Sequence, residues 1–416
     1  MKKVIVLTLS VLIFLPLIIF LKIINIFYKL KILRISSILG GNMDLYPFLI
    51  KLEHNELKRE LLIIFISDIE RVYSNKELYN LFWLKSLFYR LSPLKIKNEN
   101  FFYFYNKFCE ALFLTIRRFK INNLILKLND LKKKEKGIEK HFIHVYENKK
   151  TPLISINLND EQFDLRNLNL KKNFISFSNR DPAYKKKQYP EFDMNYHDFR
   201  NFEIDDFIKA VKNFTKKNYS LIRMGIVTEK KMKIEDSKYH DFSKNFKRSG
   251  ELETLIISKS KFFVGPESGL DKIAAFLNIP IVYVNIHHLL WRPYFLNRCI
   301  FIPQKLKNLK TGKVFSFREM LSENIMINNE NIPLGLYYKS SDYENNNIQV
   351  INNTPEEINT AMEEMEFYLK NNFTLDKKDK EFQKTFWQLY GNDFPVNKTH
   401  IISPAFLRNN LDLLNK

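Results

Sequence analysis

The second half of the chain alternates short apolar runs with segments whose apolar residues recur at helical spacing. The apolar runs predict four buried strands, at 173–178, 219–224, 261–264 and 281–284. The segments between them predict three helices, at 204–214, 252–258 and 270–277. This alternation is typical of a parallel sheet with helices on both faces, so we expect a Rossmann-like domain here.

The part of the chain before this domain shows a weaker alternation. Residues 60–67 form an apolar run that predicts a strand, whereas 75–88 and much of 101–148 have the spacing of helices. We therefore expect one α/β domain over 36–150, followed by the Rossmann-like domain over 151–345.

The C-terminal region contains a clear helix start. Residues 354–357 read Thr-Pro-Glu-Glu, which is a capping box with Thr354 as the N-cap and Glu357 at the third helical position. A further amphipathic helix is expected at 382–390. We expect the whole region 346–416 to consist of helices that pack across the two domains.

The N-terminus carries a long uncharged and almost wholly apolar run, Val4–Leu21. It is long enough to span a bilayer and has no small-residue cleavage site, so residues 1–35 are expected to form a retained membrane anchor. The basic residues that follow it outnumber those before it, which predicts an inner-membrane protein with its catalytic part in the cytoplasm. Pro16 leaves an alternative open, in which the segment lies in the interface as a monotopic helix.

Charge and composition narrow the choice of partner. The formal net charge of +20 favours anions, but the basic residues are spread along the chain without a nucleic-acid-binding motif, so we expect no nucleic-acid partner. The two cysteines, Cys109 and Cys299, have no metal-binding or disulfide spacing. No Asp-x-Asp triplet is present, and we therefore expect no metal ion.

A glycine-flanked turn, Gly-Pro-Glu-Ser-Gly at 265–269, follows one predicted strand and precedes a helix. Ligands bind at the carboxyl ends of strands in such sheets, and free backbone N–H groups at a helix start suit a phosphate. Ser268 and the glycines would hold a diphosphate, while Glu267, which a phosphate would repel, would face sugar hydroxyls. The alternative is structural, with Ser268 as an N-cap and Asp271 as its capping partner.

Two further strand ends carry charged side chains. Arg180 and Asp181 follow the strand at 173–178, and Arg223 ends the strand at 219–224. Arginine binds two diphosphate oxygens at once, so these side chains should meet the Gly-rich turn in one crevice. For Arg180 and Arg200, a salt bridge to the neighbouring Asp181 or Asp198 is the structural alternative.

Four motifs, in order, resemble an uncharacterised family of bacterial glycosyltransferases associated with surface polysaccharide. They are Asn-Arg-Asp-Pro-Ala-Tyr at 179–184, Tyr-His-Asp-Phe-Arg-Asn at 196–201, Arg-Met-Gly at 223–225 and Phe-Val-Gly-Pro-Glu-Ser-Gly-Leu at 263–270. The turn is also similar to the donor loop of heptosyltransferases. The resemblance implies a GT-B-like fold, with two Rossmann-like domains facing a cleft, the acceptor on the first and the donor on the second. Ser178 departs from the pattern, because a His is expected there.

We therefore predict a metal-independent glycosyltransferase that needs no cofactor and moves a sugar from a nucleotide-sugar donor to a glycan or lipid-linked acceptor. The expected catalytic residues are Arg180, Asp181, His197 and Asp198, with Asp181 as the leading general base. The expected donor ligands are Arg223, Gly225, Gly265, Glu267, Ser268 and Gly269. The expected acceptor-side residues are Tyr184, Arg200 and Asn201. A non-catalytic membrane-associated glycan- or anion-binding protein and a pyruvyl-type transferase acting on sugars remain as alternatives.

Overall fold

The computed structural model describes two separate compact units. The described residues are 2–27, 29–35, 60–66, 99–125, 173–188, 190–191, 193, 195–225, 227–245, 250–287, 289, 298–322, 324–327, 330–334, 339–372, 374–389 and 400–415. The first unit is Met1–Ile156 with Ser249–Glu251, and the second is Asn157–Arg248 with Leu252–Lys416.

The second unit is built on a seven-stranded sheet in which every neighbouring pair of strands is parallel. The strands are β3 (Phe174–Phe177), β4 (Ser220–Arg223), β5 (Tyr239–Asp241), β6 (Phe263–Gly265), β7 (Ile281–Ile286), β8 (Cys299–Pro303) and β13 (His400–Ile402). The four strands predicted from apolar runs are confirmed as β3, β4, β6 and β7. All their residues are buried, because helices cover both faces of a parallel sheet.

The strand order places one reversal in the middle of this sheet. The order is β13-β8-β7-β6-β3-β4-β5, so the chain runs from β3 through β4 to the edge strand β5 and then returns to the other side of β3 with β6. This reversal between β3 and β6 is the topological switch point of a doubly wound sheet. The expected Rossmann-like arrangement of the second domain is thereby confirmed in its strand order.

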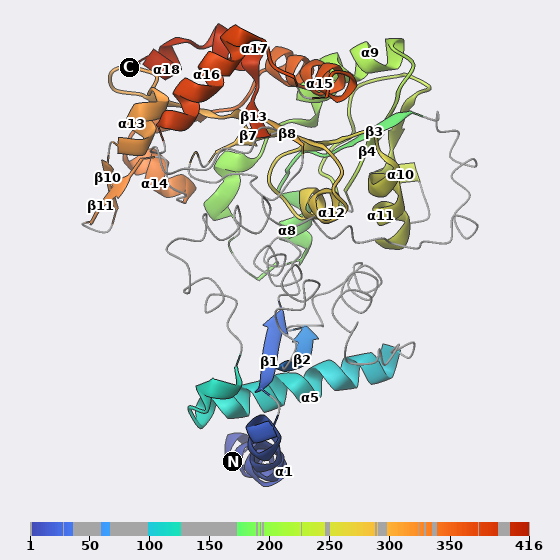
Figure 1. Ribbon diagram of the computed structural model, residues 1–416, viewed down its shortest axis with the longest axis vertical. Coiled ribbons are helices and arrows are strands. Elements are labelled where there is room, and N and C mark those ends of the chain that lie inside the picture. Colours follow the sequence, from blue (N-terminus) through green and yellow to red (C-terminus); the bar gives the residue numbers. More distant parts are fainter. Residues whose placement is uncertain are drawn as a thin grey trace. The chain divides into compact units, whose positions relative to one another are not determined.

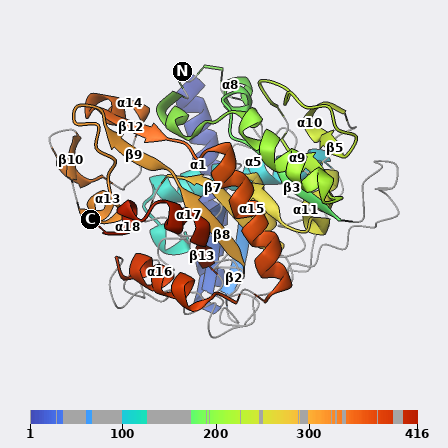
Figure 2. The same ribbon diagram turned by 90° about the horizontal axis from the view of Figure 1, so that it is seen from above.

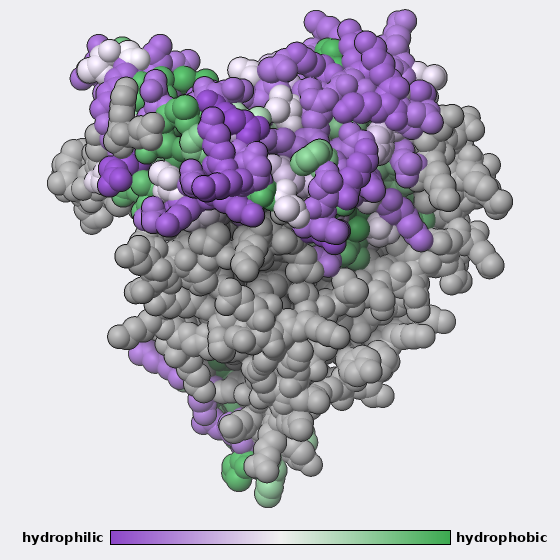
Figure 3. Space-filling model, turned by 45° about the horizontal axis from the view of Figure 1, so that its top comes forward, coloured by the Kyte–Doolittle hydropathy of each residue, from purple (hydrophilic) through white to green (hydrophobic). Residues whose placement is uncertain are grey.

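Helices cover the two faces of the sheet (Figures 1 and 2). One face carries α9 (Ile208–Lys216), which follows the short η7 (Ile204–Phe207), together with α15 (Pro355–Lys370), α16 (Lys377–Gln388) and α17 (Pro404–Asn409). The other face carries α10 (Phe242–Asn245), α11 (Gly250–Lys259) and α12 (Leu270–Phe276). The helices predicted between the strands are confirmed. On the face shown in Figure 3, the coloured residues are mostly hydrophilic, with smaller hydrophobic areas among them.

The predicted capping box at the start of α15 is also confirmed. The Thr354 hydroxyl accepts a hydrogen bond from the Glu357 N–H at 3.2 Å, and the Glu357 carboxylate accepts one from the Thr354 N–H at 2.9 Å. Two orphan donors of the first helical turn are thus satisfied. The expected helix at 382–390 corresponds to α16, which begins earlier and ends at Gln388.

Smaller elements complete the second unit. They are α8 (Ala183–Gln188), η6 (Asn195–Arg200), β9 (Lys305–Asn308), α13 (Phe317–Ser322), β10 (Asn324–Ile327), β11 (Glu330–Pro333), α14 (Ser340–Asn345), β12 (Ile348–Ile351) and α18 (Asp412–Asn415). Two antiparallel pairs form, β9 with β12 and β10 with β11. The region 346–416 supplies the strands β12 and β13 to this unit as well as helices, so the expectation that it consists of helices alone is wrong. Its packing across two domains stays a prediction.

In the first unit, the described elements are α1 (Lys2–Phe27), β1 (Lys29–Ile35), β2 (Glu60–Ile66), α5 (Glu99–Arg118) and η4 (Asn122–Leu124). β1 and β2 pair in parallel, which confirms the strand predicted at 60–67. α5 confirms the first part of the helical stretch predicted at 101–148, whereas the helix predicted at 75–88 lies outside the described residues. These elements fit an α/β class, and a Rossmann-like first domain stays a prediction.

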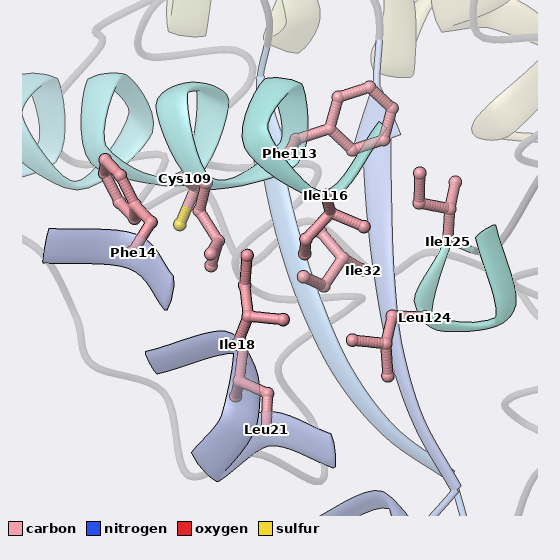
Figure 4. Packing of buried hydrophobic residues seen from close by; sticks show 10 residues of the cluster. Phe14, Ile18, Leu21, Ile32, Cys109, Phe113, Ile116, Leu124 and Ile125 are labelled. Carbon is pink, nitrogen blue, oxygen red and sulfur yellow. The ribbon is translucent and has the colours of Figure 1, made fainter. Parts of the chain in front are cut away.

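A cluster of buried apolar side chains holds α1 against α5 and β1 (Figure 4). α1 contributes Phe14, Ile18 and Leu21, α5 contributes Cys109, Leu112, Phe113 and Ile116, and the rest are Ile32, Leu124 and Ile125. Among the helices in the described ranges, none is both long enough and apolar enough to cross a membrane. The anchor expected over residues 1–35 is not shown.

Candidate functional site

The switch point brings the ends of β3 and β6 into direct contact. The Ser178 N–H donates to the Val264 carbonyl at 2.9 Å, so pairing continues past the last residue of β3. A Cβ placed on Gly265 would lie 3.0 Å from the Ser178 carbonyl oxygen and 3.0 Å from its hydroxyl. Glycine at position 265 therefore permits the close approach of the two loops that sequence analysis singled out.

The loop after β3 is fastened to η6. The Arg180 guanidinium donates to the His197 carbonyl at 2.6 Å and to the Asn201 side-chain oxygen at 2.8 Å. The Phe202 N–H in turn donates to the Arg180 carbonyl at 3.1 Å. The structure thus brings together the motifs at 179–184 and 196–201, although Arg180 does so through neutral acceptors and not through the salt bridge to Asp181 that was the structural alternative.

Arg200 joins η6 to the loop after β6. Its guanidinium donates to the Glu267 carbonyl at 2.5 Å and lies 3.5 Å from the Glu267 carboxylate. The Lys272 ammonium lies 3.7 Å from the other carboxylate oxygen. Arg200 was expected on the acceptor side, and the structure places it in contact with the expected donor residue. The Glu267 carboxylate is held between two cations and remains 28% exposed.

The turn that follows Glu267 is organised by a buried carboxylate. Asp271 accepts hydrogen bonds from the Ser268 N–H at 2.7 Å, from the Lys272 ammonium at 2.8 Å and from the Tyr283 hydroxyl at 3.0 Å. Burial raises the pKa of Asp271, and the Lys272 ammonium opposes that effect. The N-cap of α12 is Gly269, whereas the structural alternative placed Ser268 there. The hydrogen bond from the Ser268 N–H to Asp271 is one of the two bonds expected of a capping box. Ser268 and Gly269 as donor ligands stay predictions.

Three cations surround His197. Burial lowers the pKa of His197 to about 3, with the charges of Lys185, Arg200 and Arg180 adding to the effect. Burial and the same two arginines lower the pKa of Lys185 to about 8, and Asp198 acts in the opposite direction. The Lys185 ammonium also lies 5.0 Å from the centre of the Tyr196 ring. We call Arg180, Lys185 and Arg200 the cation cluster. His197 is neutral at pH 7, and its low pKa makes it a weak proton acceptor.

Lys185 was missed by sequence analysis. It is the first residue of the run Lys185-Lys186-Lys187, which has the composition of a solvated basic face. Lys186 and Lys187 are exposed, whereas Lys185 is half-buried among the cations. The signal that could have identified it is its place in the first turn of α8, directly after the strand-end motif.

Asp181 and Arg223 hold a loop in place. Asp181 accepts hydrogen bonds from the Ala183 N–H at 3.0 Å and from the Glu229 N–H at 3.3 Å. The Arg223 side chain is fully buried, lies 3.4 Å from the Asp241 carboxylate and donates to the Lys230 carbonyl at 2.6 Å. The structure thus ties Arg223 to protein partners, and its contact with a diphosphate stays a prediction. The role of Asp181 as general base stays a prediction too.

The other predicted residues differ in exposure and in partners. Gly225 has φ +129°, a conformation that L side chains rarely adopt, so its role is in the backbone. Tyr184 is exposed. The Asp198 carboxylate accepts a hydrogen bond from the Asn201 amide at 2.7 Å and is only half-buried. In the described ranges, no group of three His, Cys, Asp or Glu residues could hold a metal ion, and metal independence stays a prediction.

A buried polar network supports η6 from the side of the sheet, and sequence analysis did not find it. His287 contacts Gln304 through one ring nitrogen at 3.0 Å and Tyr343 through the other. Gln304 donates to the Phe199 carbonyl at 3.1 Å. Asn352 donates to the Asn201 carbonyl at 3.2 Å. Segments far apart in the chain thus fix the backbone of η6.

Comparisons with known proteins give weak likenesses. No protein-family model matches the chain, and no curated protein matches its sequence. Among solved structures, the chain is similar to the E. coli ADP-heptose LPS heptosyltransferase II, with 13% identity, a TM-score of 0.39 and coverage of 82% of this chain and 100% of that chain.

Two other solved structures show similar levels of likeness. A glycosyl transferase family 9 protein from Veillonella parvula DSM 2008 has 12% identity, a TM-score of 0.33 and coverage of 61% of this chain and 80% of that chain. The S. aureus MnaA–UDP structure has 11% identity, a TM-score of 0.27 and coverage of 61% and 79%. At TM-scores this low, none of these likenesses supports a conclusion about fold or activity.

Proposed function

We propose that this protein is a glycosyltransferase that binds a nucleotide-sugar donor at the switch point of its second unit. The observation that carries the proposal is the cation cluster of Arg180, Lys185 and Arg200, which stands where the ends of β3 and β6 meet. Ligands of doubly wound sheets bind outside the carboxyl ends of the strands at this point. Three of the four sequence motifs that resemble bacterial glycosyltransferases lie after β3, on η6 and after β6, and the fourth lies at the end of β4.

The charges of the cluster favour a diphosphate. Holding like charges close together in a half-buried site costs free energy, which an anion of high charge density offsets. Guanidinium groups bind phosphate oxygens in pairs, and an ammonium adds a point charge. During transfer, these groups would stabilise the negative charge that develops on the leaving nucleoside diphosphate.

Glu267 adds a hydrogen-bond acceptor for sugar hydroxyls beside the cation cluster. Its carboxylate is partly exposed beside the cation cluster, and carboxylates accept hydrogen bonds from vicinal sugar hydroxyls. Arg200 and Lys272 compensate its charge, so that it can stand near a diphosphate without strong repulsion. A diphosphate at the cluster and hydroxyls at Glu267 together correspond to a nucleotide sugar.

In the transfer step, the acceptor hydroxyl loses a proton to a carboxylate while its oxygen forms a bond to the anomeric carbon. The bond from that carbon to the phosphate oxygen breaks, and the nucleoside diphosphate leaves. His197 is too weak a base, so the proposed proton acceptor is one of two carboxylates. They are Asp181, which accepts hydrogen bonds from the Ala183 and Glu229 N–H groups, and Asp198, which accepts one from the Asn201 amide. The GT-B arrangement, the glycan or lipid-linked acceptor and cytoplasmic placement at the inner membrane remain part of the proposal.

The test is binding of a panel of nucleotide sugars and free nucleoside diphosphates to the full chain, measured by thermal shift and calorimetry. We expect selective binding of one nucleotide sugar, loss of affinity in Lys185→Ala, and little change in Lys186→Ala, whose lysine is exposed. Indiscriminate binding of all polyanions that disappears with salt would instead indicate the non-catalytic anion-binding protein. Release of nucleoside diphosphate on addition of acceptor glycans then tests for transfer.

A further inference from the structure

One side of α1 is buried within the first unit. From residue 14 onwards, Phe14, Ile18 and Leu21 are buried against α5 and β1, and Leu17 is partly buried beside them. These positions recur at helical spacing and form one stripe. Figure 4 shows Phe14, Ile18 and Leu21 in the same cluster as Ile32 and Ile116.

The opposite side of α1 is exposed and almost wholly apolar. Its exposed residues are Leu15, Pro16, Ile19, Phe20, Lys22, Ile23, Ile26 and Phe27. At 3.6 residues per turn, they cover roughly half of the helix circumference. Phe20 is 57% exposed, and Ile26 and Phe27 are each 78% exposed. Soluble proteins rarely expose a continuous apolar surface of this kind unless something binds it. We call this set of residues the exposed face of α1.

The exposed charged side chains of the first unit, among those of known exposure, are all basic. Among its side chains of known exposure, the exposed basic residues are Lys22, Arg117, Arg118 and Lys120, and no exposed residue is acidic. Lys22 lies on the exposed face of α1 itself. Apolar residues flanked by lysine and arginine are typical of helices that lie at an anionic lipid surface.

We propose that the exposed face of α1 docks in the plane of an anionic lipid bilayer, with the opposite face of the helix remaining packed on α5 and β1. This inference does not rest on the proposed glycosyltransferase activity. It explains why α1 is apolar on both sides, because protein covers one side and acyl chains cover the other.

Charge decides between the possible occupants of this face. A second copy of the chain would bring Lys22 of each copy, and two chains of net charge +20, towards each other. Anionic headgroups instead attract Lys22, which lies on the exposed face itself. A helix that crosses a bilayer would have to leave its packing on α5, since lipid would surround it on all sides.

The experiment is flotation of the full chain with vesicles of phosphatidylcholine alone or mixed with phosphatidylglycerol. We expect binding to the mixed vesicles and a loss of about tenfold or more in Phe20→Glu, because burial of one large apolar side chain accounts for such a factor. Phe367→Glu is the matched control, since Phe367 on α15 is 56% exposed against 57% for Phe20. Lys22→Glu should weaken binding to the mixed vesicles. Unchanged circular dichroism and thermal unfolding show that Phe20→Glu and Lys22→Glu are folded.

Extraction distinguishes the modes of attachment. A helix lying in the plane should be released from membranes by alkaline carbonate, whereas resistance to carbonate would indicate a span and overturn the proposal. Equal binding of Phe20→Glu and the unchanged chain would also overturn it. A dimer in light scattering that Phe20→Glu converts to a monomer would assign the face to a second copy instead.

Discussion

Arg200 binds Glu267 twice, through a 2.5 Å hydrogen bond to its backbone carbonyl and a 3.5 Å approach to its carboxylate. The contact joins η6 to the loop after β6. One guanidinium nitrogen makes both contacts, so a single group holds the backbone and the side chain of Glu267. Glu267 is thereby pre-oriented on the side of the switch point where the cation cluster stands.

We expect Arg200→Lys to weaken donor binding by about 1–3 kcal/mol, because the shorter lysine side chain does not reach the position of the Arg200 nitrogen that contacts both the carbonyl and the carboxylate of Glu267. Calorimetry with the selected nucleotide sugar measures the change. Arg318→Lys, at an exposed arginine of α13, is the control and should bind normally. Equal affinities for the two variants would show that the Arg200 contact does not orient the donor site.

Gly265→Ala should destabilise the second unit by about 1–3 kcal/mol, since the new Cβ would stand 3.0 Å from the Ser178 carbonyl oxygen in a paired backbone. Urea unfolding measures the loss. Combining it with Ser178→Ala tests the cause, because this second change removes the crowded hydroxyl and leaves the carbonyl. We expect partial recovery in the double variant. Full recovery would mean that the hydroxyl alone is responsible.

Donor binding should weaken as the pH rises through about 8. The folded pKa of Lys185 is lowered to about 8, so Lys185 is protonated below that pH and loses its charge above it. A bound diphosphate favours the protonated form, and affinity is therefore greatest below pH 8. Calorimetry at pH 7 and pH 9 gives the ratio of affinities. Lys185→Arg should flatten the profile, because arginine keeps its charge, and an unchanged profile would remove Lys185 from the site.

The same pKa shift has the opposite effect on the stability of the free protein. The unfolded lysine binds its proton up to a pKa of about 10.4, whereas folded Lys185 releases it near 8. Between these values the unfolded state holds more protons, so this group makes the free protein more stable as the pH rises. Urea unfolding of the unchanged chain and of Lys185→Met over this pH range isolates the contribution of Lys185 to the pH dependence of stability.

Four of the five interior strands of the sheet were predicted from sequence, whereas the interior strand β8 and the edge strands β5 and β13 were not. β3, β4, β6 and β7 are buried on both faces, which requires continuous apolar runs that are visible in the sequence. β5 and β13 have three residues each and lie at the edges of the sheet. Runs this short cannot be distinguished from loops by periodicity.

The site was predicted at the level of loops and less well at the level of single side chains. Strand ends in a parallel sheet meet at one edge, so the convergence of the motifs around Arg180 and Glu267 followed from topology. The burial of Arg223 depends on Asp241, which stands on the unpredicted strand β5. The Arg200 contact is made to a backbone carbonyl, and side-chain identity gives no signal for such a bond.

Glu364 should make the stability of the second unit depend on pH. Burial raises the pKa of its carboxyl to about 7, while hydrogen bonds from the Ser403 hydroxyl and the Ala405 N–H oppose that shift. The unfolded carboxyl titrates near 4.3, so between that pH and 7 the folded state holds more protons, and stability falls as the pH rises. Urea unfolding at pH 5 and pH 8 measures the fall. Glu364→Gln keeps an acceptor for the Ala405 N–H, its amide N–H can donate to the Ser403 hydroxyl, and it does not titrate. It should therefore reduce the fall, and the same pH dependence in this variant would assign it to another group.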